Sequence, residues 1–129
     1  MAGRQAAIAH AALKRVQAEL GKRQLDALLV AQPENRRYLS GYSAEDNGIQ
    51  ESAGFLLIPE SGRPRLLTDS RFTLQAEAEA PEYGIYMYRR GLVEALEELL
   101  PEMGIRQLGF EADYCLLTQI GRASCRERV

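Results

Sequence analysis

The stretch "LDALLVAQPENRRYLSG", residues Leu25 to Gly41, places a strand directly before a short helix. The run LDALLVAQ is almost continuously apolar, which is typical of a central strand covered on both faces. Pro33 ends this strand and suits the first turn of a helix, and Gly41 is placed to close that helix. The stretch therefore predicts the centre of a layered α/β domain.

Further helices and strands are predicted on both sides of this stretch. Residues 6–20 carry apolar side chains at helical spacing, and Gly21 is placed to terminate that helix. The segments AGFLLIPE and RPRLLTD are separated by the turn residues Ser61 and Gly62, which predicts a hairpin. A hairpin contains an antiparallel pair, so the sheet is not expected to be wholly parallel.

The second half of the chain continues the alternation. In DSRFTLQAEAEAP, Asp69 or Ser70 is placed to cap a helix that Pro81 stops. The remaining elements are predicted in the order strand YGIYMYR, helix GLVEALEELLPEMG, strand RQLGFEA and the start of a helix at DYCLLTQ. The fold class predicted is α/β, a three-layer domain with a mixed, mostly parallel sheet flanked by helices.

Composition narrows the class of protein. A chain of 129 residues with 46% apolar content makes one domain of ordinary core size. No apolar run approaches the roughly 18 residues of a membrane span, and the charged N-terminus is unlike a secretory signal, so a cytoplasmic protein is expected. The net charge of -2 gives no basic surface for nucleic acid.

The last ten residues, Ile120 to Val129, differ abruptly in composition from the rest, with three arginines and no periodicity. Reading the codons ATC GGA AGA GCG TCG TGT AGG GAA AGA GTG gives this string of residues, and that DNA closely resembles a common short-read sequencing adapter. We expect residues 1–119 to form the native domain and residues 120–129 to be a non-native tail, which would make the natural protein longer. The alternative is a genuine basic interaction tail.

The search for catalytic chemistry is largely negative. His10 is the single histidine, whereas a zinc site needs two or three further nitrogen or sulfur ligands. Neither a Ser-His-Asp nor a Cys-His set can be assembled, and Cys115 is the one cysteine that remains without the tail. Glycine-rich phosphate loops are absent from the sequence. No catalytic residue and no metal ligand is therefore assigned.

Two charged residues follow the strand RLLT and leave alternatives open. Asp69 lies at the exit of a strand, where α/β folds often place functional groups, but helix capping explains it better than metal binding. Arg71 could hold a ligand carboxylate in a bidentate manner or pair with a buried acid of its own domain. The glutamates of both later helices, including Glu79, are expected to form solvated faces.

The loop from Ser43 to Ser52 is unusually long for a connection between buried elements. It carries Glu45, Asp46 and Asn47, and Tyr42 stands at its entrance. One hypothesis is a flexible solvated linker. The other is a loop that contacts a ligand or another subunit.

Four segments together carry a resemblance to a known family: LDALLVAQPENRRYLSGYSA, GFLLI, RLLTDSRFTLQAEAEAP and LGFEADYCLLTQ. In this order and spacing they resemble the N-terminal domain of the creatinase, prolidase and Xaa-Pro aminopeptidase family, over most of residues 6–119. The resemblance implies a small α/β domain that precedes a pita-bread catalytic domain. That second domain would hold two divalent metal ions, manganese, cobalt or zinc, whose ligands have no match in this chain.

The resemblance also implies a role for the long loop. In family members the N-terminal domain packs in a homodimer, and this loop approaches the active site of the partner subunit, where a proline-containing peptide binds. Carried over to this sequence, the substrate-proximal residues are Tyr42, Glu45, Asp46, Asn47 and Arg71. Here TDSRF replaces the more usual TDGRY, which keeps Arg71 in place but changes its neighbours.

Two functions are therefore considered. The first is the non-catalytic N-terminal domain of a metal-dependent Xaa-Pro peptidase, which mediates dimerisation and shapes the partner's substrate site. The alternative is a stand-alone peptide- or protein-binding module of the same fold. Metal ligands in the sequence beyond residue 119 of the natural protein would distinguish them.

Overall fold

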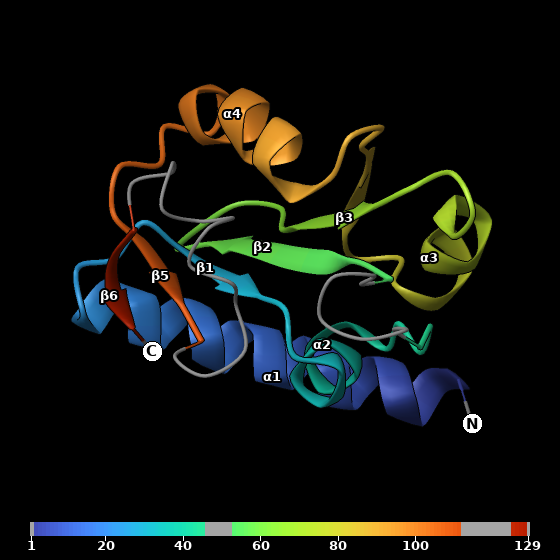
Figure 1. Ribbon diagram of the computed structural model, residues 1–129. Coiled ribbons are helices and arrows are strands. Elements are labelled where there is room, and N and C mark those ends of the chain that lie inside the picture. The colour runs from blue at the N-terminus through green and yellow to red at the C-terminus, as the bar shows by residue number, and fades with distance from the viewer. Residues whose placement is uncertain (1, 46–52, 112–124, 129) are drawn as a thin grey trace.

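The computed structural model describes residues 2–45, 53–111 and 125–128 (Figure 1). Helices and strands alternate along these segments, as the sequence predicts. They are α1 (Ala2–Lys22), β1 (Ala27–Val30), α2 (Pro33–Ser40), β2 (Phe55–Pro59), β3 (Arg65–Thr68), α3 (Thr73–Glu79), β4 (Gly84–Met87), α4 (Leu92–Glu102), β5 (Leu108–Phe110) and β6 (Cys125–Arg128).

The described strands form one sheet in the order β4-β3-β2-β1-β5-β6. The pairs β4–β3, β1–β5 and β5–β6 are parallel, while β2 is antiparallel to both of its neighbours. The prediction of a mixed, mostly parallel sheet is confirmed. β6 falls within residues 120–129, and its place beside β5 does not test whether that segment is native.

Both faces of the sheet are covered, which makes three layers. Leu28 and Val30 of β1 pack into the core beneath α1, α2 and α3, whereas Ala27 and Leu29 pack into a second core beneath α4. Figure 1 shows α4 alone on one side of the sheet and α1 with α2 on the other. Side chains alternate between the faces of a strand, so the apolar run of β1 supplies both cores.

Local signals set the boundaries of several elements as predicted. Pro33 begins α2, and Gly41 ends it in the left-handed conformation at φ 88°. β2 and β3 form the predicted hairpin, in which Phe55 pairs with Leu67. Leu92, Leu96 and Leu99 lie on the buried face of α4. The helix predicted at DYCLLTQ lies outside the described residues.

Two predicted helix boundaries are wrong. α1 continues through Gly21 to Lys22, and the residue in the left-handed conformation after this helix is Gln24, at φ 58°, rather than Gly21. Neither Asp69 nor Ser70 caps α3, because that helix begins at Thr73 and its N-cap, Phe72, makes no side-chain capping bond. α3 does end before Pro81.

Candidate functional site

The long loop leaves the end of α2 and returns to the sheet at the start of β2. Its described parts are the outgoing stem, up to Glu45, and the returning stem, Ala53 and Gly54. Tyr42 is fully buried, whereas Glu45 is exposed. Asp46 and Asn47, which we predict to contact substrate, lie outside the described residues.

A buried arginine joins the two stems. Arg36 of α2 is fully buried, and its guanidinium donates hydrogen bonds of 2.7 Å to the carbonyl oxygens of both Ala44 and Gly54. The same guanidinium lies 5.4 Å from the centroid of the Tyr42 ring, within the range of a cation–π contact. One side chain thus holds two backbone positions from opposite ends of the loop.

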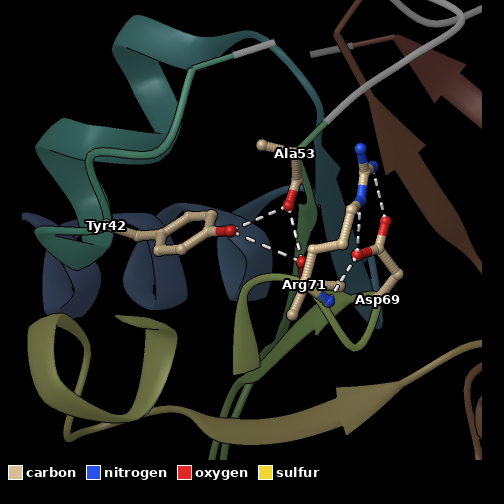
Figure 2. A network of polar contacts seen from close by, with 5 residues as sticks. Tyr42, Ala53, Asp69 and Arg71 are labelled. Atoms are coloured by element: carbon tan, nitrogen blue, oxygen red, sulfur yellow. Dashed lines mark hydrogen bonds and ion pairs between the residues drawn. The ribbon is translucent and has the colours of Figure 1, made fainter. Parts of the chain in front are cut away.

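Two hydroxyl groups converge on the returning stem (Figure 2). The Tyr42 hydroxyl donates to the carbonyl oxygen of Ala53 at 2.8 Å, and Thr68 Oγ1 donates to the same oxygen at 2.6 Å. Burial raises the pKa of Tyr42, so its hydroxyl stays protonated and able to donate at neutral pH. Tyr42 therefore supports the returning stem of the loop through its hydroxyl, and its buried ring is not exposed to a ligand.

Arg71 forms a bidentate pair with Asp69 on the other side of Ala53 from Tyr42 in Figure 2. Arg71 Nε lies 3.0 Å from Asp69 Oδ1, and Arg71 Nη2 lies 2.8 Å from Asp69 Oδ2. The hydrogen bonds from Arg71 hold the pKa of the Asp69 carboxyl below its ordinary value. The acid is partly exposed rather than buried, and the Arg71 side chain is 61% exposed.

The outgoing stem is also tied to α3. Glu79 accepts hydrogen bonds from the Ser43 backbone N–H at 2.8 Å and from Ser43 Oγ at 2.9 Å. Gln75, one turn earlier, donates to the same carboxylate at 3.2 Å. Glu79, predicted to lie on a solvated helix face, is half-buried, and its carboxylate also holds the first residue of the loop.

A cleft of about 310 Å³ lies beside this contact, between α1, the end of α2 and the end of α3. Its lining is mostly small and apolar, with two carboxylates, and consists of Ala6, Ala9, Ser40, Gly41, Ala78, Glu79, Pro81 and Glu82. His10 Nδ1 lies 2.6 Å from Glu82 Oε2 at the surface. Within the described segments, no three His, Cys, Asp or Glu side chains are grouped closely enough to hold a metal ion.

Two supporting residues were not predicted from the sequence. Arg36 and Thr68 contact the loop stems, but neither belongs to a known reactive motif. A signal for Arg36 was present, because it lies three and four residues before Leu39 and Ser40 and so shares their buried helix face. Thr68 carries no such signal beyond its place at the end of β3.

Comparison with known proteins identifies the domain. Residues 13–124 match the model of the Creatinase/Prolidase N-terminal domain. The chain belongs to this family. Other members are the N-terminal domains of metallopeptidases, and the α/β fold with a mixed sheet described above is theirs.

Solved structures of the Creatinase/Prolidase N-terminal domain support the assignment. The N-terminal domain of the cytoplasmic peptidase PepQ from Mycobacterium tuberculosis H37Rv is 28% identical, with a TM-score of 0.76, and the match covers 92% of each chain. The Xaa-Pro dipeptidase from Bacillus anthracis is 25% identical, also with a TM-score of 0.76, over 94% of this chain but 33% of its own. Such relatives carry a C-terminal catalytic domain beyond the matched one.

A curated relative shows the same partial coverage. The uncharacterized peptidase YqhT of Bacillus subtilis (strain 168) is 26% identical over 99 residues. This match covers 77% of the present chain but only 26% of YqhT. Separately, none of the helices in the described segments is long and apolar enough to cross a membrane.

Proposed function

We propose that this chain is the non-catalytic N-terminal domain of a metal-dependent Xaa-Pro peptidase of the aminopeptidase P or prolidase type. The observation that carries the proposal is the family match over residues 13–124, together with relatives that extend far beyond it. In the complete cytoplasmic protein, a catalytic domain with two manganese, cobalt or zinc ions would activate water against proline-containing peptides.

We also propose that the domain forms a homodimer in which the loop 43–52 shapes the substrate site of the partner subunit. Support for the role of the loop comes from the buried contacts at its stems. Burying the charged guanidinium of Arg36 has a free-energy cost, and hydrogen bonds to both stems compensate for it. The exposed Glu45, with Asp46, would attract the free amino terminus of a peptide. Tyr42 would shape the pocket wall from beneath, and Arg71, which is paired with Asp69, would lie near the substrate.

The test uses the complete protein, expressed from the uninterrupted gene, and follows release of an amino acid from an Xaa-Pro dipeptide with and without manganese. We expect manganese-dependent hydrolysis. In the double variant Glu45→Ala with Asp46→Ala we expect KM to rise roughly tenfold with a smaller change in kcat, because ground-state contacts to the amino terminus are lost. Glu60→Ala is the matched control, since Glu60 is exposed in the hairpin turn at the other end of β2.

Light scattering checks that all three proteins form the same dimer. Unchanged kinetics of the loop variant, with the dimer preserved, would refute the role of the loop. A complete gene without metal ligands after residue 119, and a protein without hydrolysis, would instead favour the binding module. Sequencing that gene also tests the prediction that residues 120–129 are foreign.

A further inference from the structure

We infer that Arg36 is a positioning residue that fixes the separation of the two loop stems and thereby supports the proposed role of the loop in substrate binding. This inference rests on the proposed function of the loop 43–52. It concerns a side chain that lies on α2, outside that loop. It assigns to Arg36 no contact with substrate.

The geometry of the guanidinium is the first argument. Its two terminal nitrogens donate separately, Nη1 to Gly54 and Nη2 to Ala44, each at 2.7 Å. A guanidinium is planar and rigid, so the two acceptors are held at a spacing that the fork itself sets. An ammonium group on a flexible stem would not impose the same spacing.

The helix that carries Arg36 is itself held in place, which is the second argument. Ser40 Oγ donates to the Arg36 carbonyl oxygen at 2.6 Å and accepts from the Tyr42 N–H at 3.0 Å. At the other end of α2, Glu111 accepts hydrogen bonds from the N–H groups of Ala31 and Gln32 at 2.6 and 2.9 Å. The guanidinium is thus presented from a helix fixed at both ends.

The third argument is energetic. A charged side chain taken fully out of water costs several kcal/mol before compensation. Most buried side chains of the described segments are apolar, and the buried polar ones are Gln17, Ser40, Thr68 and Arg36, of which only Arg36 is charged. A hydrophobic side chain would fill this position without the free-energy cost of burying a charge. It could not donate hydrogen bonds to both stems, as the guanidinium does.

Amide hydrogen exchange on the 129-residue chain tests the inference directly. In Arg36→Met we expect the amides of Ala44, Glu45 and Gly54 to exchange about tenfold faster, relative to those of Leu29 and Leu57 in the core, because both stem carbonyls lose their donor. Arg36→Lys keeps the charge and supplies the test if the methionine variant does not fold; we expect a smaller increase of the same pattern. Arg37→Met, on the exposed face of α2, is the matched control and should leave exchange unchanged.

Kinetics of the complete protein separate positioning from stability. We expect Arg36→Lys to raise KM about tenfold with kcat changed less than twofold, since a displaced loop weakens substrate binding. Stem exchange that rises no more than core exchange in both variants would overturn the inference, as would a lower kcat with unchanged KM. If the double loop variant at Glu45 and Asp46 also has unchanged kinetics, the proposed function itself has failed; if that variant raises KM while Arg36→Lys does not, only the role of Arg36 has failed.

Discussion

The two ends of β2 are joined to their neighbouring elements in contrasting ways. At one end, the hairpin turn around Gly62 is short and exposed, and a Cβ atom on Gly62 would meet nothing within 4 Å. At the other end, a long loop returns through Ala53 and Gly54, whose carbonyls are held by three buried side chains, Arg36, Tyr42 and Thr68. The hairpin turn is held by one neutral buried side chain, Gln17, which donates to the carbonyl oxygens of Pro59 and Gly62 at 3.0 and 3.1 Å, whereas the loop stems are held by several buried side chains that include the charged Arg36.

The difference lies in the number and the charge of the buried polar groups at the two ends. A connection that only links two elements can be short, since most connections in compact domains are. Buried hydroxyl and guanidinium groups destabilise the fold when they lack hydrogen-bond partners. When all of them are paired, the network fixes one arrangement of the backbone. A short hairpin held by one such group fits a structural connection, and the denser network at the loop stems fits the proposed role of that loop.

The largest difference in stability is expected between alanine substitutions at Gly54, just before β2, and at Gly62, in the hairpin turn after it. A Cβ atom at Gly54 would lie 2.8 Å from the Leu67 carbonyl oxygen, so Gly54→Ala forces backbone apart in addition to straining a φ of 157°. We expect this variant to lose about 3 kcal/mol of the free energy of unfolding. Gly62→Ala, where φ is 97° and space is open, should lose about 1 kcal/mol.

Urea denaturation of both variants measures the contrast. An equal loss in the two would contradict the close packing of the returning stem. The slope of the free energy of unfolding against urea concentration reports the surface exposed on unfolding. If this slope changes only in Gly54→Ala, the two free energies are compared by amide hydrogen exchange instead.

A smaller effect is expected at the surface beside the stem. Arg71→Ala removes the side-chain hydrogen bonds that lower the pKa of Asp69 and keeps the one from the backbone N–H, so that pKa should rise part of the way toward its ordinary value in an NMR titration. Arg63→Ala, in the hairpin, is the control and should leave the pKa of Asp69 where it is. An unchanged pKa in Arg71→Ala would show that the pair does not form in solution.

The lowered pKa of Asp69 also determines how the stability contributed by the Arg71–Asp69 pair depends on pH. The folded-state pKa of Asp69 lies below its unfolded value, so the pair contributes its full stability above the unfolded pKa and loses it as pH falls through the folded pKa. With Arg71 61% exposed, that contribution should be under about 1 kcal/mol. The difference in stability between wild type and Arg71→Ala should therefore shrink in acid.

The helices and strands could be predicted from the sequence better than the side chains that support the loop. Pro33, Gly41 and the hairpin turn act through their own backbones, so their effects can be read locally. Arg36 could not be assigned in the same way, because its acceptor at Gly54 is eighteen residues away and is brought near by the sheet. The shared helix face with Leu39 indicates that Arg36 is buried, but only the tertiary fold shows which carbonyl oxygens its guanidinium binds.

The same limit explains the error at Asp69. Aspartate before a helix commonly caps it, but here the neighbouring Arg71 competes for the carboxylate, and its backbone N–H also donates to Asp69 Oδ1 at 2.9 Å. Of the residues predicted to lie near substrate, Tyr42 is buried as a support, while Glu45 and Arg71 are exposed. Their contacts with substrate stay a prediction.

The most direct test of the central claim is a mixed-subunit assay of the complete protein. Subunits with Glu45→Ala and Asp46→Ala are combined with subunits that have an intact loop but lack one metal ligand of the catalytic domain. If the loop serves the partner's active site, each hybrid dimer pairs one intact loop with one intact metal site across the interface, and its KM for an Xaa-Pro dipeptide should return to the wild-type value. A KM that stays at the level of the loop variant would contradict the account.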